Sequence, residues 1–344
     1  CCSGTYKNNY QLCCGIKGNN VITYDCIRAS VEITAEELKS FIVKNGDILF
    51  QRSSETLEDV GRANVYMDDK PAVFGGFVIR GKKKSEYNPL FFKYLLATPY
   101  ARRKIIPMGA GAQHFNIGQE GLSKVKLYFP ILQEQHKIAS LLQLIDERIS
   151  TQNKIIEKLQ SLIKGIAQHC IKESTSGNAY VKLGDICQIT TGKLDANAKV
   201  DNGIYPFFTC AERPFKIDSF AFDTEALLIS GNGANLGYIN YYNGKFNAYQ
   251  RTYVLDIFSE NIQYIKWALK VLLPKRIAIE KSSSNTPYIV LSTLSNLRLP
   301  IPNKSNQCHI AKLMQSLERK LSSQIALNGF YNKLKQYLLR QMFI

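Results

Sequence analysis

The chain has 344 residues, of which 45% are hydrophobic and 11% are aromatic. This length predicts two or three domains, and the composition excludes a disordered chain. Lys and Arg outnumber Asp and Glu by 44 to 28, and the resulting net charge of +16 favours a polyanionic partner such as nucleic acid. No apolar run approaches the roughly 18 residues needed to cross a bilayer.

The nine cysteines are an odd number with irregular spacing, which favours reduced thiols in a cytoplasmic protein over a disulfide framework. The doublets Cys1-Cys2 and Cys13-Cys14 have no neighbouring His, and no C-x-x-C pair occurs in the sequence. We therefore expect no metal site. The N-terminal CCSGTYKNNY has no apolar core typical of a signal peptide.

Residues 1–131 alternate short strand and helix patterns. TAEELKS (34–40) is typical of a capped helix start, GDILF (46–50) of a strand, and Asn88-Pro89 predicts a helix that continues to about Ile105. Asp25 with Glu37 and Lys39 imitates a nuclease centre, and N-P-L-F at 88–91 imitates a methyltransferase motif. Helix capping accounts for both motifs.

A duplication organises the rest of the chain. LSKVKLYFP (122–130) returns as LSNLRLPIP (294–302), 172 positions later (294 minus 122), and we expect a strand at both places. Upstream, FFKYLL (91–96) resembles YIKWAL (264–269). A period this long indicates tandem copies of a whole domain, because solenoid repeats are only about 20 to 50 residues long. Further matches at the same offset are Gln135 with Gln307, Ile138 with Ile310, and Ala139 with Ala311.

Each copy is followed by a long helix. From Ile138, apolar residues recur at alternate steps of four and three over four heptads, with Gln152 the only polar member of the seam. The second copy has Gln324 at the equivalent place, and Asn328 and Lys335 weaken its seam beyond that point. The two helices are predicted to pair as an antiparallel coiled coil, in which Gln152 and Gln324 meet and fix the register.

These patterns predict an α+β protein: two globular mixed α/β domains in tandem, each followed by a long helix, with pseudo-twofold symmetry. The predicted boundaries are 1–131 for the first domain and 132–173 for its helix. A polar linker follows at 174–179, then the second domain at 180–303 and its helix at 304–344.

Equivalent loops of the two domains carry amide, hydroxyl and basic side chains, which suit base edges and phosphates. The predicted base contacts are Gln51, Ser53, Ser54, Gln113, His114, Asn116, Asn232, Asn235, Gln250, Arg251, Ser282, Ser283, Asn285 and Thr286. The predicted phosphate contacts are Arg52, Arg62, Arg102 and Arg103, and Lys281 belongs to a basic stretch before the last loop.

No catalytic constellation emerges from the sequence. GNGANLG (231–237) lacks the Lys-Ser/Thr of a phosphate loop, and the four His residues have no metal-ligand spacing. We expect a protein that is not an enzyme and that binds no cofactor. The alternatives left open are a stand-alone DNA methyltransferase or nuclease of unfamiliar layout, and a coiled-coil scaffold that does not bind DNA.

Taken together, the chain resembles a specificity subunit of a type I restriction–modification system. The resemblance rests on the two-copy layout, on KLGDI (182–186), on GDILFQRSS (46–54), and on the repeated L-x-x-P-x-x-x-x-Q-x-x-I-A that leads into each long helix. It implies two target recognition domains that read a bipartite, asymmetric DNA site. It also implies docking of methyltransferase subunits, two in number, and of restriction and translocase subunits.

The chain departs from the family pattern in its first domain, where KLGDI has no clear counterpart. The N-terminal strand of that domain is therefore expected to be absent or strongly diverged. The second helix also departs, because it follows PNKSNQCHIA and lacks the Glu of PILQEQHKIA.

Overall fold

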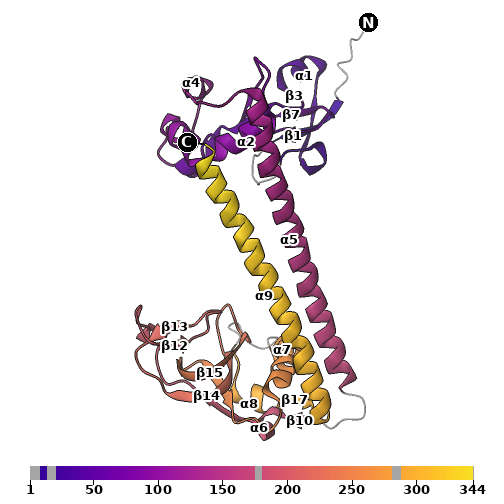
Figure 1. The fold of residues 1–344 in the computed structure, drawn as a ribbon, viewed down its shortest axis with the longest axis vertical. Helices are drawn as coiled ribbons and strands as arrows, with labels where there is room; N and C mark the ends of the chain where they lie inside the picture. Colours follow the sequence, from indigo (N-terminus) through magenta and orange to yellow (C-terminus); the bar gives the residue numbers. More distant parts are fainter. Residues whose placement is uncertain (1–7, 14–20, 175–179, 281–287, 344) are drawn as a thin grey trace. The chain divides into compact units, whose positions relative to one another are not determined.

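The computed structural model describes residues 8–13, 21–174, 180–280 and 288–343. The chain divides into two compact units, of which the first comprises residues up to Asn153 together with Ala326–Ile344, and the second comprises Lys154–Ile325. Each unit contains one α/β domain, one part of the first long helix and one part of the second (Figure 1). The tandem layout of two mixed α/β domains and two long helices is confirmed.

The first domain is built on small sheets. A four-stranded sheet has the order β2-β1-β7-β3, a three-stranded sheet has the order β6-β4-β8, and β5 pairs with β9. The strands are β1 (Asn8–Cys13), β2 (Ser30–Ile33), β3 (Ile42–Val43), β4 (Ile48–Gln51), β5 (Ser53–Ser54), β6 (Ala63–Val65), β7 (Ala72–Phe74), β8 (Val78–Gly81) and β9 (Phe115–Asn116). The helices of this domain are α1 (Ala35–Phe41), α2 (Pro89–Ala97), α3 (Pro99–Ile105) and α4 (Gln119–Ser123).

The second domain has one larger sheet of six strands in the order β11-β16-β14-β15-β12-β13, and a separate pair, β10 with β17. The strands are β10 (Tyr180–Lys182), β11 (Gln188–Thr191), β12 (Tyr205–Phe208), β13 (Phe215–Ile217), β14 (Phe222–Ser230), β15 (Ile239–Ala248), β16 (Thr252–Asp256) and β17 (Arg298–Pro300). The helices are α6 (Leu183–Ile186), α7 (Ile262–Glu280) and α8 (Leu291–Ser295). The long helices are α5 (Leu132–Glu173) and α9 (Lys304–Gln341).

The long helices run antiparallel, as predicted. In the first unit, Leu142 near the start of α5 shares a buried cluster with Leu339 at the end of α9. In the second unit, Ile163 and Ala167 near the end of α5 pack with Met314 near the start of α9. Within each unit the two helices lie side by side (Figure 1).

The polar residues in the seam of α9, Asn328 and Lys335, contact polar residues of α5. The Lys335 ammonium forms an ion pair with Asp146 on α5, and the Asn328 side chain donates to Asn153 Oδ1 at 2.9 Å. Polar residues at these two seam positions of α9 are therefore compatible with helix pairing, because α5 presents polar partners to them.

A buried glutamine joins the first domain to its long helix. Gln135, in the first turn of α5, accepts a hydrogen bond from the Asn88 backbone N–H at 3.0 Å and donates to the Pro130 carbonyl at 2.9 Å. Asn88 in turn caps α2, because its side-chain oxygen accepts from the Phe91 N–H at 2.9 Å. The predicted capped helix with Pro89 in its first turn is confirmed.

The second domain repeats this arrangement. Gln307, which is 1% exposed, accepts from the Asn261 backbone N–H at 3.0 Å and donates to the Pro302 carbonyl at 2.8 Å. Its side chain also donates to the Glu260 carboxylate at 2.7 Å. The repeated spacing between proline and glutamine in the two copies thus has a structural cause, since each glutamine lies on a long helix and satisfies polar groups of the adjoining domain.

Two predicted elements differ in the structure. The helix expected to run from Pro89 to about Ile105 is interrupted at Thr98, because Pro99 has no N–H to continue α2 and Thr98 caps a new helix by accepting from the Ala101 N–H. The LSxxxL segments are not strands throughout, since Leu122 and Ser123 lie in α4, and the corresponding residues of the second copy lie in α8.

Only the second copy has a strand just beyond this point. There β17 pairs antiparallel with β10, with Val181 opposite Leu299. In the part of the first domain that the structure describes, residues 126–130 form no strand, and nothing corresponds to β10. A ladder needs two strands, and the described part of the first domain offers residues 126–130 no partner strand, whereas the second domain offers β10 to β17.

The predicted helix start at 34–40 and the predicted turn at 231–237 agree with the structure. Thr34 and Glu37 form a capping box at the start of α1, so Glu37 is engaged in helix capping. GNGANLG connects β14 to β15 as a turn between antiparallel strands. Among the described helices, none combines the length and apolarity that crossing a membrane requires. The described residues also contain no group of three or more His, Cys, Asp or Glu side chains placed to hold a metal.

Candidate nucleic-acid interface

The fold brings the two predicted loops of the first domain together. β5 pairs antiparallel with β9, with Ser53 opposite Asn116 and Ser54 opposite Phe115. The Ser53 hydroxyl donates to the Asn116 side-chain oxygen, which ties the loop after β4 to the 110–116 loop. Gly111 turns this second loop with a φ of 144°, where a Cβ atom would lie 2.0 Å from the His114 carbonyl oxygen.

The predicted base contacts of this domain fall into two groups. Gln51, Ser53 and Asn116 make hydrogen bonds inside the domain: Gln51 donates to the Ser53 carbonyl at 3.0 Å, and Ser53 binds Asn116. Gln113 and His114 are exposed, and their side chains have no hydrogen bond to any residue that the structure describes. The first group holds the loops, and the second group is available to a ligand.

The predicted phosphate contacts also differ in their surroundings. Arg52 is exposed and only weakly tied, at 3.5 Å from the Gly76 carbonyl. Arg62 forms an ion pair with Asp59 at 2.7 Å, although its side chain is 60% exposed. Arg103 is exposed on α3.

Arg102 is held more firmly than the other three. One of its terminal nitrogens donates to the carbonyls of Val60 and Glu58, at 2.6 and 2.9 Å. Burial lowers the pKa of the Arg102 guanidinium, and the nearby charge of Arg62 lowers this pKa further.

In the second domain, four predicted contacts gather at the ends of neighbouring strands around Cys210. The Cys210 thiol donates to Asn232 Oδ1 at 3.0 Å, and the Asn235 amide donates to the Cys210 carbonyl at 2.9 Å. Gln250 and Arg251 lie beside this loop, since the Gly231 N–H donates to the Arg251 carbonyl at 2.8 Å. The side chains of Gln250 and Arg251 are exposed and form no hydrogen bond with the described residues.

A shallow cavity of about 230 Å³ marks this place in the second domain. Its lining includes Gly231, Gln250, Arg251 and Tyr253. The Tyr253 hydroxyl donates to the Ile289 carbonyl at 2.8 Å, and the Ile289 N–H donates to Gly231. The chain segment just after the predicted 283–288 loop therefore meets the 231–237 loop.

Some predicted contacts cannot be placed. Lys281, Ser282, Ser283, Asn285 and Thr286 lie outside the described residues. Cys210 was not predicted, although its thiol and carbonyl organise the second loop cluster. A single cysteine after β12 gives no signal in the sequence, because its partners come from strands that are distant along the chain.

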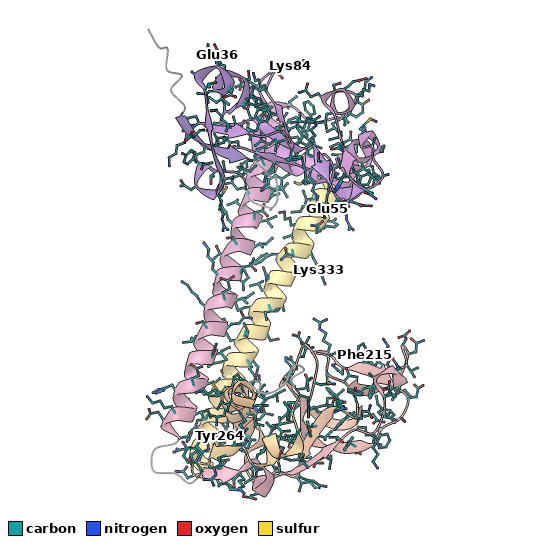
Figure 2. All side chains as sticks on the ribbon, turned by 180° about the vertical axis from the view of Figure 1, so that it is seen from behind. Glu36, Glu55, Lys84, Phe215, Tyr264 and Lys333 are labelled. Atoms are coloured by element: carbon teal, nitrogen blue, oxygen red, sulfur yellow. The ribbon has the colours of Figure 1, made fainter. Side chains whose placement is uncertain are left out.

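The second domain also has exposed aromatic rings that lie next to lysine ammonium groups. Phe215 lies on β13 at the edge of the six-stranded sheet and is 40% exposed, with the Lys199 ammonium 4.8 Å from its ring centre (Figure 2). The Lys245 ammonium similarly lies 4.7 Å from the ring centre of Phe220. Such pairs offer both stacking faces and positive charge, which are features of nucleic-acid-binding surfaces.

The two seam glutamines lie in different units. Gln152 is a buried residue of α5 in the first unit, and Gln324 belongs to the part of α9 in the second unit. Their predicted contact stays a prediction.

The chain is thus a duplicated protein of two α/β domains, each followed by a long helix and each presenting exposed polar side chains at its loops. A family model described as type I restriction modification DNA specificity domain matches residues 7–161 and again residues 175–327. The chain belongs to this family and carries its domain twice.

Known relatives are also specificity subunits of type I restriction enzymes. The EcoDI specificity subunit of Escherichia coli is 41% identical over 143 residues, which are 42% of this chain and 32% of that protein. The match thus spans about a third of that relative. The MjaVIII specificity subunit of Methanocaldococcus jannaschii is 23% identical over 338 residues, covering 84% of this chain and 75% of that protein.

Solved structures share the fold. The crystal structure of the type I restriction–modification S subunit from M. genitalium superposes with a TM-score of 0.62 at 18% identity, covering 97% of this chain and 88% of that one. A chain from a study of complex assembly and conformational transition in the type I restriction–modification system superposes with a TM-score of 0.59 at 16% identity, covering 98% of this chain and 91% of that one.

Proposed function

We propose that this chain is the sequence-specific DNA recognition subunit of a type I restriction–modification complex and performs no catalysis itself. The observation that carries the proposal is the presence of two family domains whose free loop residues differ. Gln113 and His114 are available in the first domain, and Gln250 and Arg251 in the second. Because the two sets of side chains differ, the two half-sites differ, and the bipartite DNA site is asymmetric.

We further propose the division of the chain into two target recognition domains, 1–131 and 180–303, carried on helices 132–173 and 304–344 and joined by the linker 174–179. A pseudo-twofold arrangement would match the dyad of duplex DNA, and paired helices of fixed length would set the spacing of the half-sites. The antiparallel packing of α5 and α9 inside each unit supports this arrangement.

The partners in this proposal are double-stranded DNA, two methyltransferase subunits, and restriction and translocase subunits. Exposed apolar residues at repeated positions of the two long helices support two equivalent docking sites. Leu141 is 40% exposed and Leu313 is 45% exposed, and they lie 172 positions apart (313 minus 141). Ile155 and Leu327, at the same separation, are 39% and 37% exposed. Exposed apolar residues at repeated positions are suited to covering by a partner.

We place this assembly in the cytoplasm, together with the DNA that it reads. The free thiols of Cys26, Cys170, Cys187, Cys210 and Cys308 support a reducing compartment.

The function is tested by incubating the purified chain and a DNA library with S-adenosylmethionine, or with Mg²⁺, in the presence and absence of the cognate methyltransferase subunit. We expect neither methylation nor cleavage by the chain alone, and methylation at one bipartite motif when the partner is added. Native mass spectrometry of the mixture should count two methyltransferase subunits per chain. Turnover by the chain alone would instead indicate an enzyme, and salt-insensitive or absent DNA binding would indicate a scaffold.

Arg103→Ala should weaken DNA binding by a similar factor on all sequences. Arg103 is exposed and free of internal hydrogen bonds among the described residues, so its loss removes one phosphate contact without disturbing the fold. Fluorescence anisotropy at several salt concentrations should show the slope of log affinity against log salt falling by about 0.9. Arg102 is a poorer choice for this test, because its guanidinium also binds two backbone carbonyls. A changed base preference for Arg103→Ala would contradict the assignment.

Gln152 and Gln324 are proposed to meet and fix the register of the helix pair. Gln152→Cys combined with Gln324→Cys should then form an intramolecular disulfide on mild oxidation, because disulfides require Cα atoms within about 7 Å of each other. The matched control is Gln152→Cys with Gln168→Cys, since both of these positions lie on α5, 16 residues apart (168 minus 152). The absence of the first cross-link in fully folded protein would refute the contact.

A further inference from the structure

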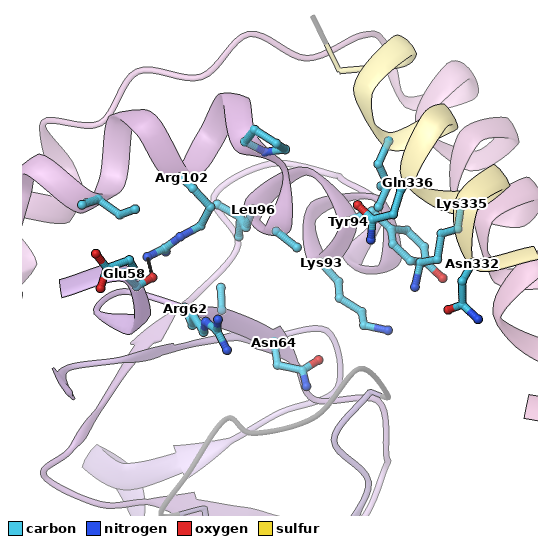
Figure 3. A pocket seen from close by; sticks show the side chains of 15 residues that line it. Glu58, Arg62, Asn64, Lys93, Tyr94, Leu96, Arg102, Asn332, Lys335 and Gln336 are labelled. Atoms are coloured by element: carbon cyan, nitrogen blue, oxygen red, sulfur yellow. Dashed lines mark hydrogen bonds between the residues drawn. The ribbon is translucent and has the colours of Figure 1, made fainter. Parts of the chain in front are cut away.

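The first unit contains a basic cavity that the loops discussed above do not explain. It has a volume of about 420 Å³ and lies between the helix pair α2–α3, the segment around η2 (Leu57–Asp59) and the end of α9 (Figure 3). Four cationic residues line it, whereas Glu58 is the single carboxylate among its described lining residues. The cationic residues are Arg62, Lys93, Arg102 and Lys335.

Two of these cations have carboxylate partners and two do not. Arg62 pairs with Asp59, and Lys335 pairs with Asp146, which also accepts from the Tyr94 hydroxyl at 2.9 Å. The Lys93 ammonium forms no hydrogen bond or ion pair with any described residue, although it lies 5.1 Å from the ring centre of Tyr94. Its side chain extends into the open space of the cavity (Figure 3).

The Arg102 guanidinium also has a donor without an acceptor. One terminal nitrogen binds two carbonyls, but the other, Nη1, is buried and has no hydrogen-bond partner. Burial is the largest influence on both cations and lowers the pKa of Lys93 and of Arg102. The Asp146 carboxylate raises the pKa of Lys93 and Lys335 lowers it, whereas Arg62 lowers the pKa of Arg102 and Asp59 raises it. Half-buried donors that carry charge and lack acceptors are costly unless a ligand supplies the acceptor.

The equivalent lysine of the second unit has different surroundings. Lys266 is the repeat of Lys93, 173 positions on (266 minus 93), and its ammonium binds the Glu318 carboxylate at 2.7 Å. Glu318 is the repeat of Asp146 (318 minus 146 is 172) but is one methylene longer, and it also reaches Lys270 at 3.1 Å. The lysine of the second unit therefore forms a direct ion pair with a carboxylate of the protein, whereas Lys93 feels the charge of Asp146 but forms no ion pair with it among the described residues.

The position of Lys335 differs between the units as well. Its repeat is Ile163 (335 minus 163 is 172), which is buried in an apolar cluster with Trp267 and Met314. The second unit thus has a buried apolar side chain where the first unit has Lys335. Packing of the helix pair does not require a cation at this position, since the second unit is completed without one there.

We propose that this cavity of the first unit binds a phosphate group. Lys93 and Arg102 supply the charge, and the amides of Asn332 and Gln336 on α9 line the same space. A cavity of this volume accepts a small ligand such as an oligophosphate or the phosphates of a nucleotide. A backbone phosphate of DNA offers the same oxygen acceptors, and the site binds either source through one chemistry. The proposal is independent of base recognition by the loops.

The test uses the full chain and pyrophosphate as the probe, measured by isothermal titration calorimetry at low salt and without DNA. We expect one saturable site, and Lys93→Gln should weaken it about tenfold or more, because a charge-assisted hydrogen bond is lost. The matched control is Lys333→Gln, which removes the same charge from an exposed position of α9 outside the cavity (Figure 2) and should leave affinity unchanged.

A second variant tests the same site without removing a cation, so that a misfolded Lys93→Gln protein would not mislead. Asp146→Glu introduces the longer carboxylate of the second unit and should give Lys93 an internal partner, so pyrophosphate affinity falls although no cation is removed. A DNA duplex of random sequence shows which molecule supplies the phosphate. If the duplex competes with pyrophosphate and binds more weakly to Lys93→Gln, the phosphate comes from the DNA backbone. Pyrophosphate binding without competition indicates a free nucleotide or oligophosphate. If the wild-type chain binds no pyrophosphate and Lys93→Gln leaves duplex affinity intact, the site does not exist.

Discussion

Gln307→Leu should lower the free energy of unfolding of the second unit by about 2–4 kcal/mol, since a buried polar group left without its partner costs about 1–3 kcal/mol. The change removes the acceptor of the Asn261 N–H and the donor to the Pro302 carbonyl and the Glu260 carboxylate. Leucine has a similar volume, so the loss is one of hydrogen bonding and not of packing. Chemical denaturation followed by circular dichroism measures the effect.

Two controls make this result interpretable. Gln168→Leu, at an exposed position of α5 in the same unit, should change stability by less than about 0.5 kcal/mol. Gln135→Leu should destabilise the first unit by a smaller amount than Gln307→Leu destabilises the second, because Gln135 has two such hydrogen bonds where Gln307 has three. Equal stability of Gln307→Leu and wild type would show that the glutamine does not join domain and helix.

Replacing the free loop side chains of one domain should relax base preference in one half of the DNA site only. Gln113→Ala with His114→Ala removes the exposed polar groups of the first domain, and Gln250→Ala with Arg251→Ala removes those of the second. Each well-placed base contact contributes about 1–3 kcal/mol of discrimination, so affinity for the cognate half-site should fall roughly 5- to 150-fold. Methylome sequencing of cells that carry each variant with the cognate methyltransferase shows which bases become degenerate.

The two double variants control each other. Both should leave the spacing between half-sites unchanged, because none of the four positions lies on α5 or α9. If both variants relaxed the same half of the motif, or if either altered the spacing, the assignment of one half-site to each domain would be wrong.

The positions of the loops explain why these residues were predictable only in part. Amide and basic side chains next to strand ends predicted which loops to consider, but the sequence did not separate residues that hold the loops from residues that are free. Ser53 and Asn116 lie 63 positions apart and become partners only when β5 and β9 pair. Asn232 and Asn235 likewise acquire their partner, Cys210, through the arrangement of β12, β14 and β16.

The sequence by itself determined the duplication and the two long helices with their apolar seams, because heptad spacing and a constant offset are local or periodic signals that survive without knowledge of contacts. The contacts within each unit show that the helices pack antiparallel. The tertiary structure decided where equivalent sequences differ. Residues 126–130 lack a strand partner among the described residues, whereas β17 has β10. Lys93 forms no ion pair with a described carboxylate, whereas Lys266 pairs directly with Glu318. These outcomes depend on which distant side chains and strands the fold brings within reach, and no local pattern encodes that.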